Sequence, residues 1–297
     1  MYRHMITGTN IEPEVVQIEN GISLHFYKLG EGKPKVFITS GIHGDEQTGV
    51  YVAEDLLQRL SKMDLFGSVI VLPVANPPAF RCKTRVSPID CLDMNRVFPG
   101  SREGTVTERL AAEIWDQARQ SDYIIDLHCC EYDCVPYTLA LHREFSYVRT
   151  FSYKLGIPYI IESTGLRGQL FVEASHEGIP AVIIEMRGGK YIDLQSAVQV
   201  REALLNFLTM LGLVQGQTLE GRSEFYGRIT EVKSPGNGMF IPKILCGAEV
   251  DEESLLGEIK GGIRIYSPLN GLLVYIEKPT YVFKGEKVAG VASKLKY

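Results

Sequence analysis

A histidine and a glutamate three residues apart stand in a glycine-rich segment, where their side chains could bind one metal ion. They are His43 and Glu46, and they follow the apolar run at residues 36–39 directly. An imidazole nitrogen and a carboxylate oxygen can each lie about 2 Å from a zinc ion, which accepts both donors. The simpler alternative is a helix N-terminus, where the helix dipole favours Glu46 and water solvates His43.

A second histidine, His128, stands at the end of another apolar run and could supply a third ligand. Two histidines and one glutamate leave one zinc position open for water, as in catalytic rather than structural sites. We therefore expect one Zn²⁺ per chain, held by His43, Glu46 and His128. Asp126 stands two residues before His128, so in a strand both side chains point to the same face, and Asp126 could orient an imidazole. The alternative is that Asp126 is a buried, paired aspartate of the core.

A third polar residue, Glu185, ends the apolar run at residues 181–184. A carboxylate beside zinc-bound water can accept a proton and pass it to a leaving amine. We interpret Glu185 as the general base. The alternative is a salt bridge between Glu185 and Arg187.

The long segment at residues 75–104 is rich in arginine and amide side chains. Loops of this length in compact domains tend to be functional, and arginine is well suited to hold a carboxylate. We expect Asn95 and Arg96 to bind the substrate, and Arg85 to polarise the scissile carbonyl in a catalytic role. A solvated surface role is the alternative for each arginine.

These candidate residues follow elements that alternate in type along the chain. An antiparallel hairpin is predicted at residues 15–29, around Asn20-Gly21. Buried strands are predicted at 36–39, 69–72, 123–125, 159–161 and 181–184, and helices at 48–60, 105–118, 144–155 and 193–211. This alternation predicts an α/β fold, in which ligands gather at the carboxyl ends of the strands.

The chain changes character at about Phe225, where short strand patterns and frequent glycines begin. We expect two domains: a zinc hydrolase domain at residues 1–221 and an all-β domain at residues 222–297. Hairpins in the second domain are similar to those of lipoyl carrier domains, but the lysine-bearing turn of a carrier is missing. A tyrosine from this region, Tyr266 or Tyr281, could reach the site, although cross-strand packing is the favoured interpretation of both.

Composition excludes several classes of function. The 297 residues are 45% hydrophobic and 23% charged, with a formal net charge of −5, so nothing favours nucleic acid or an anionic membrane surface as a partner. No apolar stretch approaches the roughly 18 residues that span a bilayer. The six cysteines show no paired spacing, which favours reduced thiols and a cytoplasmic location. A homo-oligomer is compatible with the sequence.

Taken together, the motifs resemble those of the succinylglutamate desuccinylases and aspartoacylases, a branch of the zinc carboxypeptidase-like hydrolases. The resemblance covers roughly residues 33–290. It is carried, in order, by Gly-Ile-His43-Gly-Asp-Glu46, Asn76-Pro-Pro-Ala, Asp93-Met-Asn95-Arg96-Val-Phe-Pro-Gly, Thr107-Glu-Arg109, Asp126-Leu-His128 and Gly178-Ile-Pro-Ala-Val-Ile-Ile-Glu185.

The resemblance implies a three-layer α/β/α domain with a mixed sheet, followed by a small β domain that overhangs the active site. It also implies zinc bound by His43, Glu46 and His128, with Glu185 as the catalytic residue. Substrate contacts would come from the loop residues Arg85, Asn95 and Arg96.

The segment after His128, Cys129-Cys130-Glu131-Tyr132, departs from the small or hydroxyl residues expected there, so the acyl specificity is left open. Cys130 and Cys134 could instead bind the metal, but His43 and Glu46 would then have no role. The first functional hypothesis is a deacylase that hydrolyses an N-acyl amino acid or a similar small carboxylate substrate. A carboxypeptidase acting on short peptides and a non-catalytic zinc-binding sensor are the alternatives.

Overall fold

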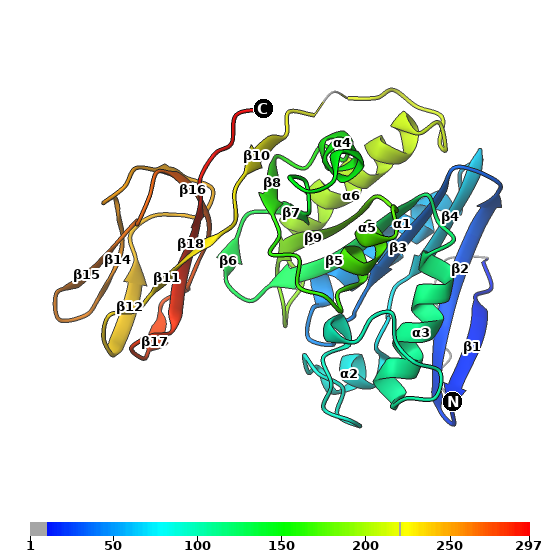
Figure 1. The fold of residues 1–297 in the computed structure, drawn as a ribbon, viewed down its shortest axis with the longest axis horizontal. Helices are drawn as coiled ribbons and strands as arrows, with labels where there is room; N and C mark the ends of the chain where they lie inside the picture. The colour runs from blue at the N-terminus through cyan, green and yellow to red at the C-terminus, as the bar shows by residue number, and fades with distance from the viewer. Residues whose placement is uncertain (1–10, 220) are drawn as a thin grey trace.

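Most of the chain folds around one nine-stranded mixed sheet, and two smaller antiparallel sheets follow it (Figure 1). The computed structural model describes residues 11–219 and 221–297. Four neighbouring strands, β4 (Gly67–Leu72), β3 (Lys35–Ser40), β5 (Tyr123–Cys130) and β9 (Ala181–Arg187), run parallel in the middle of the large sheet. Their carboxyl ends therefore meet at one edge of the sheet.

Both faces of these central strands are buried, as the apolar runs predict. Val36, Ile38 and Ile125 belong to the core on one face, whereas Phe37 and Ile124 belong to the core on the other. Alternate residues of a strand point to opposite faces, so a continuous apolar run fits a sheet that is covered on both sides.

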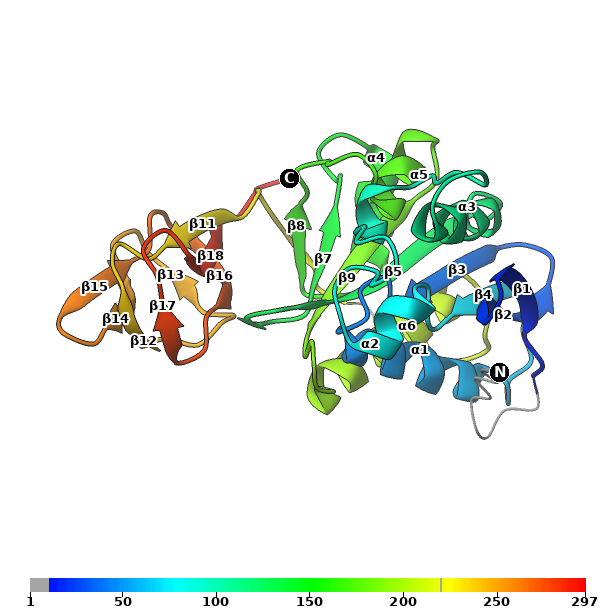
Figure 2. The same ribbon diagram turned by 90° about the horizontal axis from the view of Figure 1, so that it is seen from below.

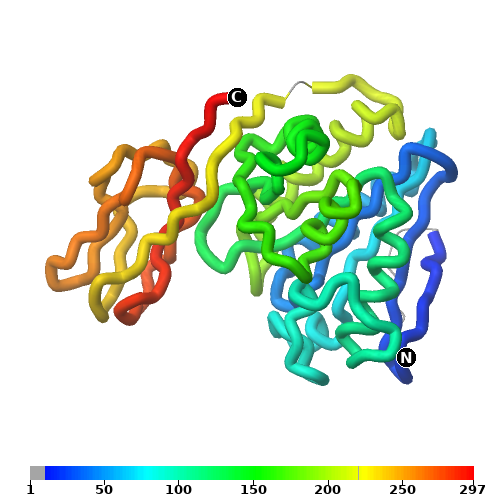
Figure 3. The backbone as a smooth tube through the Cα atoms, viewed as in Figure 1, coloured from blue at the N-terminus to red at the C-terminus, as the bar shows by residue number. Residues whose placement is uncertain are grey.

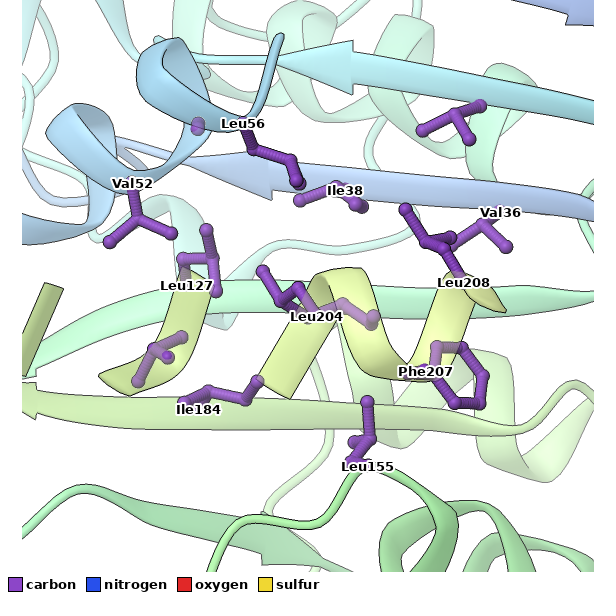
Figure 4. Packing of buried hydrophobic residues seen from close by; sticks show 14 of the residues in the cluster. Val36, Ile38, Val52, Leu56, Leu127, Leu155, Ile184, Leu204, Phe207 and Leu208 are labelled. Carbon is purple, nitrogen blue, oxygen red and sulfur yellow. The ribbon is translucent and has the colours of Figure 1, made fainter. Parts of the chain in front are cut away.

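Helices provide this cover. α1 (Gln47–Leu60) and α6 (Leu194–Met210) pack on one face, and α3 (Val106–Ala118) and α5 (Leu170–His176) on the other (Figure 2). Figure 4 shows Leu56 of α1 and Leu204 of α6 packed over strand residues such as Ile38. α4 (Ser146–Lys154) contacts α6 through Phe151 and Phe207, whose ring centroids are 5.2 Å apart. The expected three-layer α/β/α architecture is confirmed.

Additional strands extend the large sheet on both sides. β1 (Glu14–Glu19) and β2 (Ile22–Glu31) form the predicted hairpin, with Gly21 at a φ of 81° in the turn, and β2 pairs antiparallel with β4. On the far side lie β7 (Tyr137–Ala140), β8 (Tyr159–Glu162) and β10 (Glu224–Tyr226). The patterns in the sequence did not predict β7 or β10, because both are too short to show a clear period.

The C-terminal part is all β, as expected. One sheet contains, in order, β11 (Thr230–Lys233), β18 (Lys287–Ala292), β16 (Gly271–Ile276) and β13 (Glu249–Val250). The other contains β15 (Ile263–Tyr266), β14 (Leu255–Ile259), β12 (Gly238–Pro242) and β17 (Thr280–Val282). The division into domains at residue 222 stays a prediction; β10, just beyond it, pairs with the large sheet.

The large sheet and the C-terminal sheets also contact each other away from residue 222, where the chain passes from one to the other. β6 (Asp133–Cys134), which follows the central strand β5, pairs with β16 of the C-terminal part. The C-terminal end returns alongside β10, where Leu295 N–H donates to Phe225 O at 2.7 Å (Figure 3). None of the helices in the described residues is long and apolar enough to cross a membrane.

Candidate active site

His43, Glu46 and His128 converge at the carboxyl edge of the central strands. Nδ1 of His43 lies 2.6 Å from Oε1 of Glu46, and Nδ1 of His128 lies 3.0 Å from Oε2 of the same carboxylate. One ligand atom from each residue lies within 4.8 Å of the others, and all three side chains are buried. Among the residues that the structure describes, they form the one group with the geometry of a metal site.

The outward nitrogen of each imidazole meets an aspartate. Nε2 of His43 lies 3.0 Å from Oδ1 of Asp93, and Nε2 of His128 lies 2.9 Å from Oδ2 of Asp126. A carboxylate on this nitrogen holds the proton there, so that Nδ1 is free to bind a cation and the ring cannot rotate. The interpretation of Asp126 as an orienting residue therefore agrees with the structure.

The turn that carries His43 and Glu46 depends on a close approach between two segments of backbone. A Cβ at Gly44 would lie 2.0 Å from the carbonyl carbon of Ala79 in α2 (Pro77–Cys82), which leaves room only for glycine. The Gly44 N–H donates to Thr84 O at 2.9 Å. The start of the long loop thus packs against the turn and supports the positions of His43 and Glu46.

Glu46 is held in its ionised form. The backbone N–H of Cys129 donates to Oε2 at 2.9 Å. Burial by itself would raise the pKa of the Glu46 carboxyl, but the imidazoles of His128 and His43 outweigh burial and lower it well below its usual range. A buried carboxylate between two imidazoles is a suitable donor set for a divalent cation.

Glu185 lies beside His128 because the two residues are direct partners in the parallel pairing of β5 and β9. Burial raises the pKa of Glu185 to about 7, against the opposing effect of the His128 charge. Its Oε2 atom is buried without a hydrogen-bond partner in the described part of the chain. Arg187 pairs with Asp133 at 2.7 Å, so the alternative of a Glu185–Arg187 salt bridge is not observed.

The three loop residues predicted to contact substrate all line the same cavity as the metal-site residues. Arg85 lies 3.3 Å from Asp93 Oδ2 and 3.8 Å from Glu46 Oε1. Arg96 donates to its neighbour's carbonyl oxygen, Asn95 O, at 2.6 Å, and Asn95 Oδ1 accepts from the Leu170 N–H of α5 at 3.2 Å. The structure brings these residues together; their roles stay predictions.

This cavity has a volume of about 410 Å³, and the C-terminal part of the chain supplies some of its wall. The residues that it contributes are Ile229, Glu231, Tyr275 and Lys287. Tyr275 stacks on Tyr132 of the segment after β5, with ring centroids 4.6 Å apart and an interplanar angle of 19°. A cavity of this size fits a small ligand better than an extended chain.

The tyrosine that the C-terminal part contributes to the cavity is Tyr275, not Tyr266 or Tyr281. Tyr266 and Tyr281 are exposed residues of the second small sheet, and neither lines the cavity. No pattern in the sequence selects Tyr275, because it lies in an apolar run, residues 271–276, that resembles any other core strand. Cys130 also lines the cavity, but neither it nor Cys134 belongs to the metal-binding group of the described residues.

Asp93 is a further site residue for which the sequence predicts no role of its own. It caps the 3₁₀ turn η1 (Met94–Arg96) by accepting from the Asn95 N–H at 2.9 Å, while it contacts both His43 and Arg85. One feature of the sequence could have indicated a role for Asp93: it stands two residues before Asn95 and three before Arg96, the predicted substrate-binding residues. The contact with His43 spans 50 residues of sequence and is decided by the fold.

The fold and the site together define a class: α/β proteins that carry a buried His-Glu-His cluster at the carboxyl edge of a mixed sheet. The family model for the succinylglutamate desuccinylase/aspartoacylase catalytic domain matches residues 32–211. The chain belongs to this family. The resemblance that the motifs indicated is confirmed.

Known proteins similar to this chain agree with that assignment. N-alpha-acetyl-L-2,4-diaminobutyric acid deacetylase from Halomonas elongata is 32% identical over 203 residues, which are 64% of this chain but only 58% of that protein. A crystal structure of the ectoine utilization protein EutE (DoeB) from Ruegeria pomeroyi, with product bound, has a TM-score of 0.78 and 28% identity, covering 92% of this chain and 89% of the other.

The fold extends through the C-terminal part. A succinylglutamate desuccinylase/aspartoacylase structure from Rhodobacter sphaeroides has a TM-score of 0.83 over 96% of each chain, at 24% identity. This similarity concerns the fold alone, and it includes the all-β sheets as well as the large mixed sheet.

Proposed function

We propose that this protein is a zinc-dependent deacylase that hydrolyses the amide bond of a small N-acyl amino acid. The observation that carries the proposal is the placement of Glu185 beside His128, next to the His43–Glu46–His128 cluster. Family membership and the similarity to a deacetylase of an acylated amino acid support it. N-acetylated diaminobutyric acid, the substrate in the name of the Halomonas elongata relative, belongs to this class.

The residues present fit a zinc ion. Two imidazoles and one carboxylate offer three donors, both outward imidazole nitrogens are occupied by aspartates, and Glu185 leaves a buried oxygen without a partner in the described chain. Zinc, when bound, would lower the pKa of water and polarise a carbonyl oxygen. His43, Glu46 and His128 would hold it.

The chain's own groups then have distinct tasks. Glu185, whose pKa burial raises to about 7, can accept a proton near neutral pH and deliver it to the departing amine nitrogen. The guanidinium of Arg85 lies at the cavity wall and would stabilise negative charge on the former carbonyl oxygen. Asn95 and Arg96 would bind the substrate carboxylate.

Family membership and the related deacetylase favour the deacylase over the carboxypeptidase. The cavity of about 410 Å³, walled partly by Tyr275 and Lys287 of the C-terminal part, has the size of a small ligand and favours an acylated amino acid or a dipeptide over a longer peptide. Glu185 argues against the sensor alternative, because a protein that only binds zinc has no need of a proton acceptor beside the metal.

Metal content and hydrolysis of a substrate panel test this proposal together. We expect about one zinc per chain by mass spectrometry, and turnover of N-acyl amino acids in preference to dipeptides. Glu185→Gln should keep the zinc and lose about 10²- to 10⁴-fold in kcat, the usual contribution of a general base.

Different failures would point to different alternatives. Faster turnover of dipeptides would favour the carboxypeptidase. Zinc bound without turnover of any panel member would favour the sensor, and a wild-type protein that binds no zinc after reconstitution would overturn the proposal.

A further inference from the structure

One part of the cavity wall is apolar, and neither the metal cluster nor the proposed chemistry uses it. Its residues belong to the hydrophobic cluster that packs the large sheet against the C-terminal sheets. Two of them, Tyr137 and Tyr275, are buried, and the others are partly buried. We call the cluster residues that line the cavity the apolar wall; they are Cys130, Tyr132, Tyr137, Leu139, Ile229 and Tyr275.

The apolar wall begins directly beside the proposed base. Tyr137 of β7 is the antiparallel partner of Glu185, and His128 is the parallel partner of Glu185 on the other side. Residues that face each other in paired strands point to the same side of the sheet. His128, Glu185 and Tyr137 therefore form one row across the sheet, and Leu139, two residues further along β7, points the same way.

The basic side chains lie toward the opposite end of this row. Asp93 contacts His43 at 3.0 Å and Arg85 at 3.3 Å. Arg96 belongs to the turn that Asp93 caps, and its charge also acts on the Asp93 carboxyl. In the sheet, β3, which precedes His43, and β7 lie on opposite sides of β5 and β9. The cavity therefore has a basic end near His43 and an apolar end near Tyr137.

Within the described chain, no basic side chain is left without an acidic partner at the apolar end. Lys287 lines the cavity but pairs with Glu231 at 2.5 Å. Arg187 pairs with Asp133 at 2.7 Å and is not a lining residue. A carboxylate placed against the apolar wall would lose its water beside Glu185 without gaining a cation, which is costly.

We propose that the apolar wall binds the acyl group of the substrate, so that the preferred acyl groups are uncharged and longer than acetyl. The inference rests on the proposed deacylase function and adds the acyl group to it. A trans amide is planar, and its two substituents point away from each other. With the amino-acid carboxylate at the basic end and the scissile carbonyl beside Glu185, the acyl chain extends toward Tyr137. An acetyl group ends one bond beyond the carbonyl carbon and covers little of this wall.

A series of acyl groups on one amino acid tests the proposal with the zinc-loaded protein. The amino acid is the one whose acetyl derivative is hydrolysed fastest, and the acyl groups are acetyl, butanoyl, hexanoyl and succinyl. We expect butanoyl to exceed acetyl by about 10-fold in kcat/KM, since each buried methylene contributes about 2- to 4-fold. Succinyl carries a carboxylate in place of the terminal methyl of butanoyl, and we expect it to be at least about 10-fold slower than butanoyl.

Variants of the apolar wall separate its effect from that of the metal cluster. Ile229→Ala should reduce the preference for butanoyl over acetyl by about 3-fold, because it removes part of the apolar surface. Ile244→Ala is the matched control, since Ile244 is also a partly buried isoleucine of the C-terminal part but does not line the cavity; it should keep the preference. If Ile229→Ala fails to fold, Leu139→Ala makes the same comparison from the side of the large sheet.

Three results would overturn the inference. The first is turnover of the succinyl substrate as fast as, or faster than, the butanoyl substrate. The second is a preference for acetyl over butanoyl. The third is an equal preference for butanoyl in the wild type and in the wall variant that folds.

Failure of the proposed function would be distinguishable from failure of this inference. Hydroxamates offer oxygen donors to zinc and can carry the same acyl chains, so their binding by calorimetry measures the apolar wall without turnover. If no amide is hydrolysed, an affinity for butanohydroxamate about 10-fold above that for acetohydroxamate would still support the inference. Equal affinities, or tighter binding of the monohydroxamate of succinic acid, would refute it.

Discussion

His43 and His128 each have an aspartate on the outward nitrogen of the imidazole, and Asp93 has a second partner as well. It lies 3.0 Å from His43 Nε2 and 3.3 Å from Arg85. The removal of one negative charge from Asp93 would therefore disturb both a predicted ligand and the predicted oxyanion contact. Two carboxylates outside the predicted ligand set, Asp93 and Asp126, therefore hold the imidazoles of that set in place.

Asp93→Asn should weaken zinc binding by about 10- to 100-fold, the usual effect of losing a carboxylate that orients a histidine ligand. Competition with a chelator of known affinity would measure it. Asp64→Asn, at an exposed position, is the control and should bind zinc as the wild type does. Equal affinity in Asp93→Asn would show that the His43–Asp93 contact does not orient the ligand.

At the scale of elements, the turn between β3 and α1 is shaped by its contact with α2. Gly44→Ala would place a Cβ 2.0 Å from the Ala79 carbonyl carbon, so the turn must move and carry His43 and Glu46 with it. We expect weaker zinc binding and a free energy of unfolding lower by about 1–3 kcal/mol, by analogy with overpacked cores.

The matched control for that variant is Gly216→Ala, where φ is not positive and the nearest atom to a new Cβ lies at 3.4 Å. Thermal unfolding and zinc titration of both variants would separate the clash from the general effect of replacing glycine. If Gly44→Ala binds zinc as tightly as the wild type, the contact between Gly44 and Ala79 does not control the positions of His43 and Glu46.

The long loop is fixed to the start of α3 by Asp90, which accepts from the Thr107 N–H and hydroxyl, both at 2.8 Å. Burial opposes ionisation of Asp90, but these hydrogen bonds lower its pKa below the ordinary value of 3.8. The folded state therefore binds the proton less tightly than the unfolded state, and the stabilisation is present above about pH 4 and lost as pH falls through the folded pKa.

Asp90→Asn should lower the free energy of unfolding by about 1 kcal/mol at pH 7, the usual net contribution of such hydrogen bonds. Urea unfolding of wild type and variant across pH 2–7 would show the difference shrink below about pH 4. Exposed Glu103→Gln is the control. If wild type and variant still differed as much in free energy of unfolding at pH 2 as at pH 7, the ionised carboxylate of Asp90 would not be the cause of the difference.

At the scale of the whole molecule, the C-terminal sheets contribute to the cavity through the stacked pair Tyr132 and Tyr275. A double-mutant cycle with alanine at both positions should give a coupling energy of about 0.5–1.5 kcal/mol in unfolding, as for other aromatic pairs. KM for the preferred substrate should also rise in each single variant, because both residues line the cavity.

Tyr281 and Phe283 provide a comparison pair, with ring centroids 5.3 Å apart on the exposed side of the C-terminal part. Their removal should leave KM unchanged. If the loss of Tyr275 affects stability but not KM, the C-terminal sheets stabilise the protein without shaping the cavity.

The elements that the sequence predicted well are those with strong local signals. The strands around Val36, Ile124 and Val182 are buried on both faces of the sheet. Such a strand needs apolar residues at every position, so it can be recognised as an apolar run in the sequence. Thr105, with Glu108 three residues later, forms the capping box that starts α3. β7 and β10 carry no such signal, because strands of three or four residues are determined by their neighbours.

From the sequence alone, His43, Glu46 and His128 can be predicted as metal ligands, since each follows a predicted strand and has a donor type that zinc accepts. The sequence also shows that Glu185 is a carboxylate at the end of an apolar run. The contacts between distant residues of the site come from the tertiary structure: Asp93 lies on His43, and Tyr275 stacks on Tyr132. Both contacts join segments far apart in the chain, and the packing of the whole fold, not the residues next to each segment, brings them together.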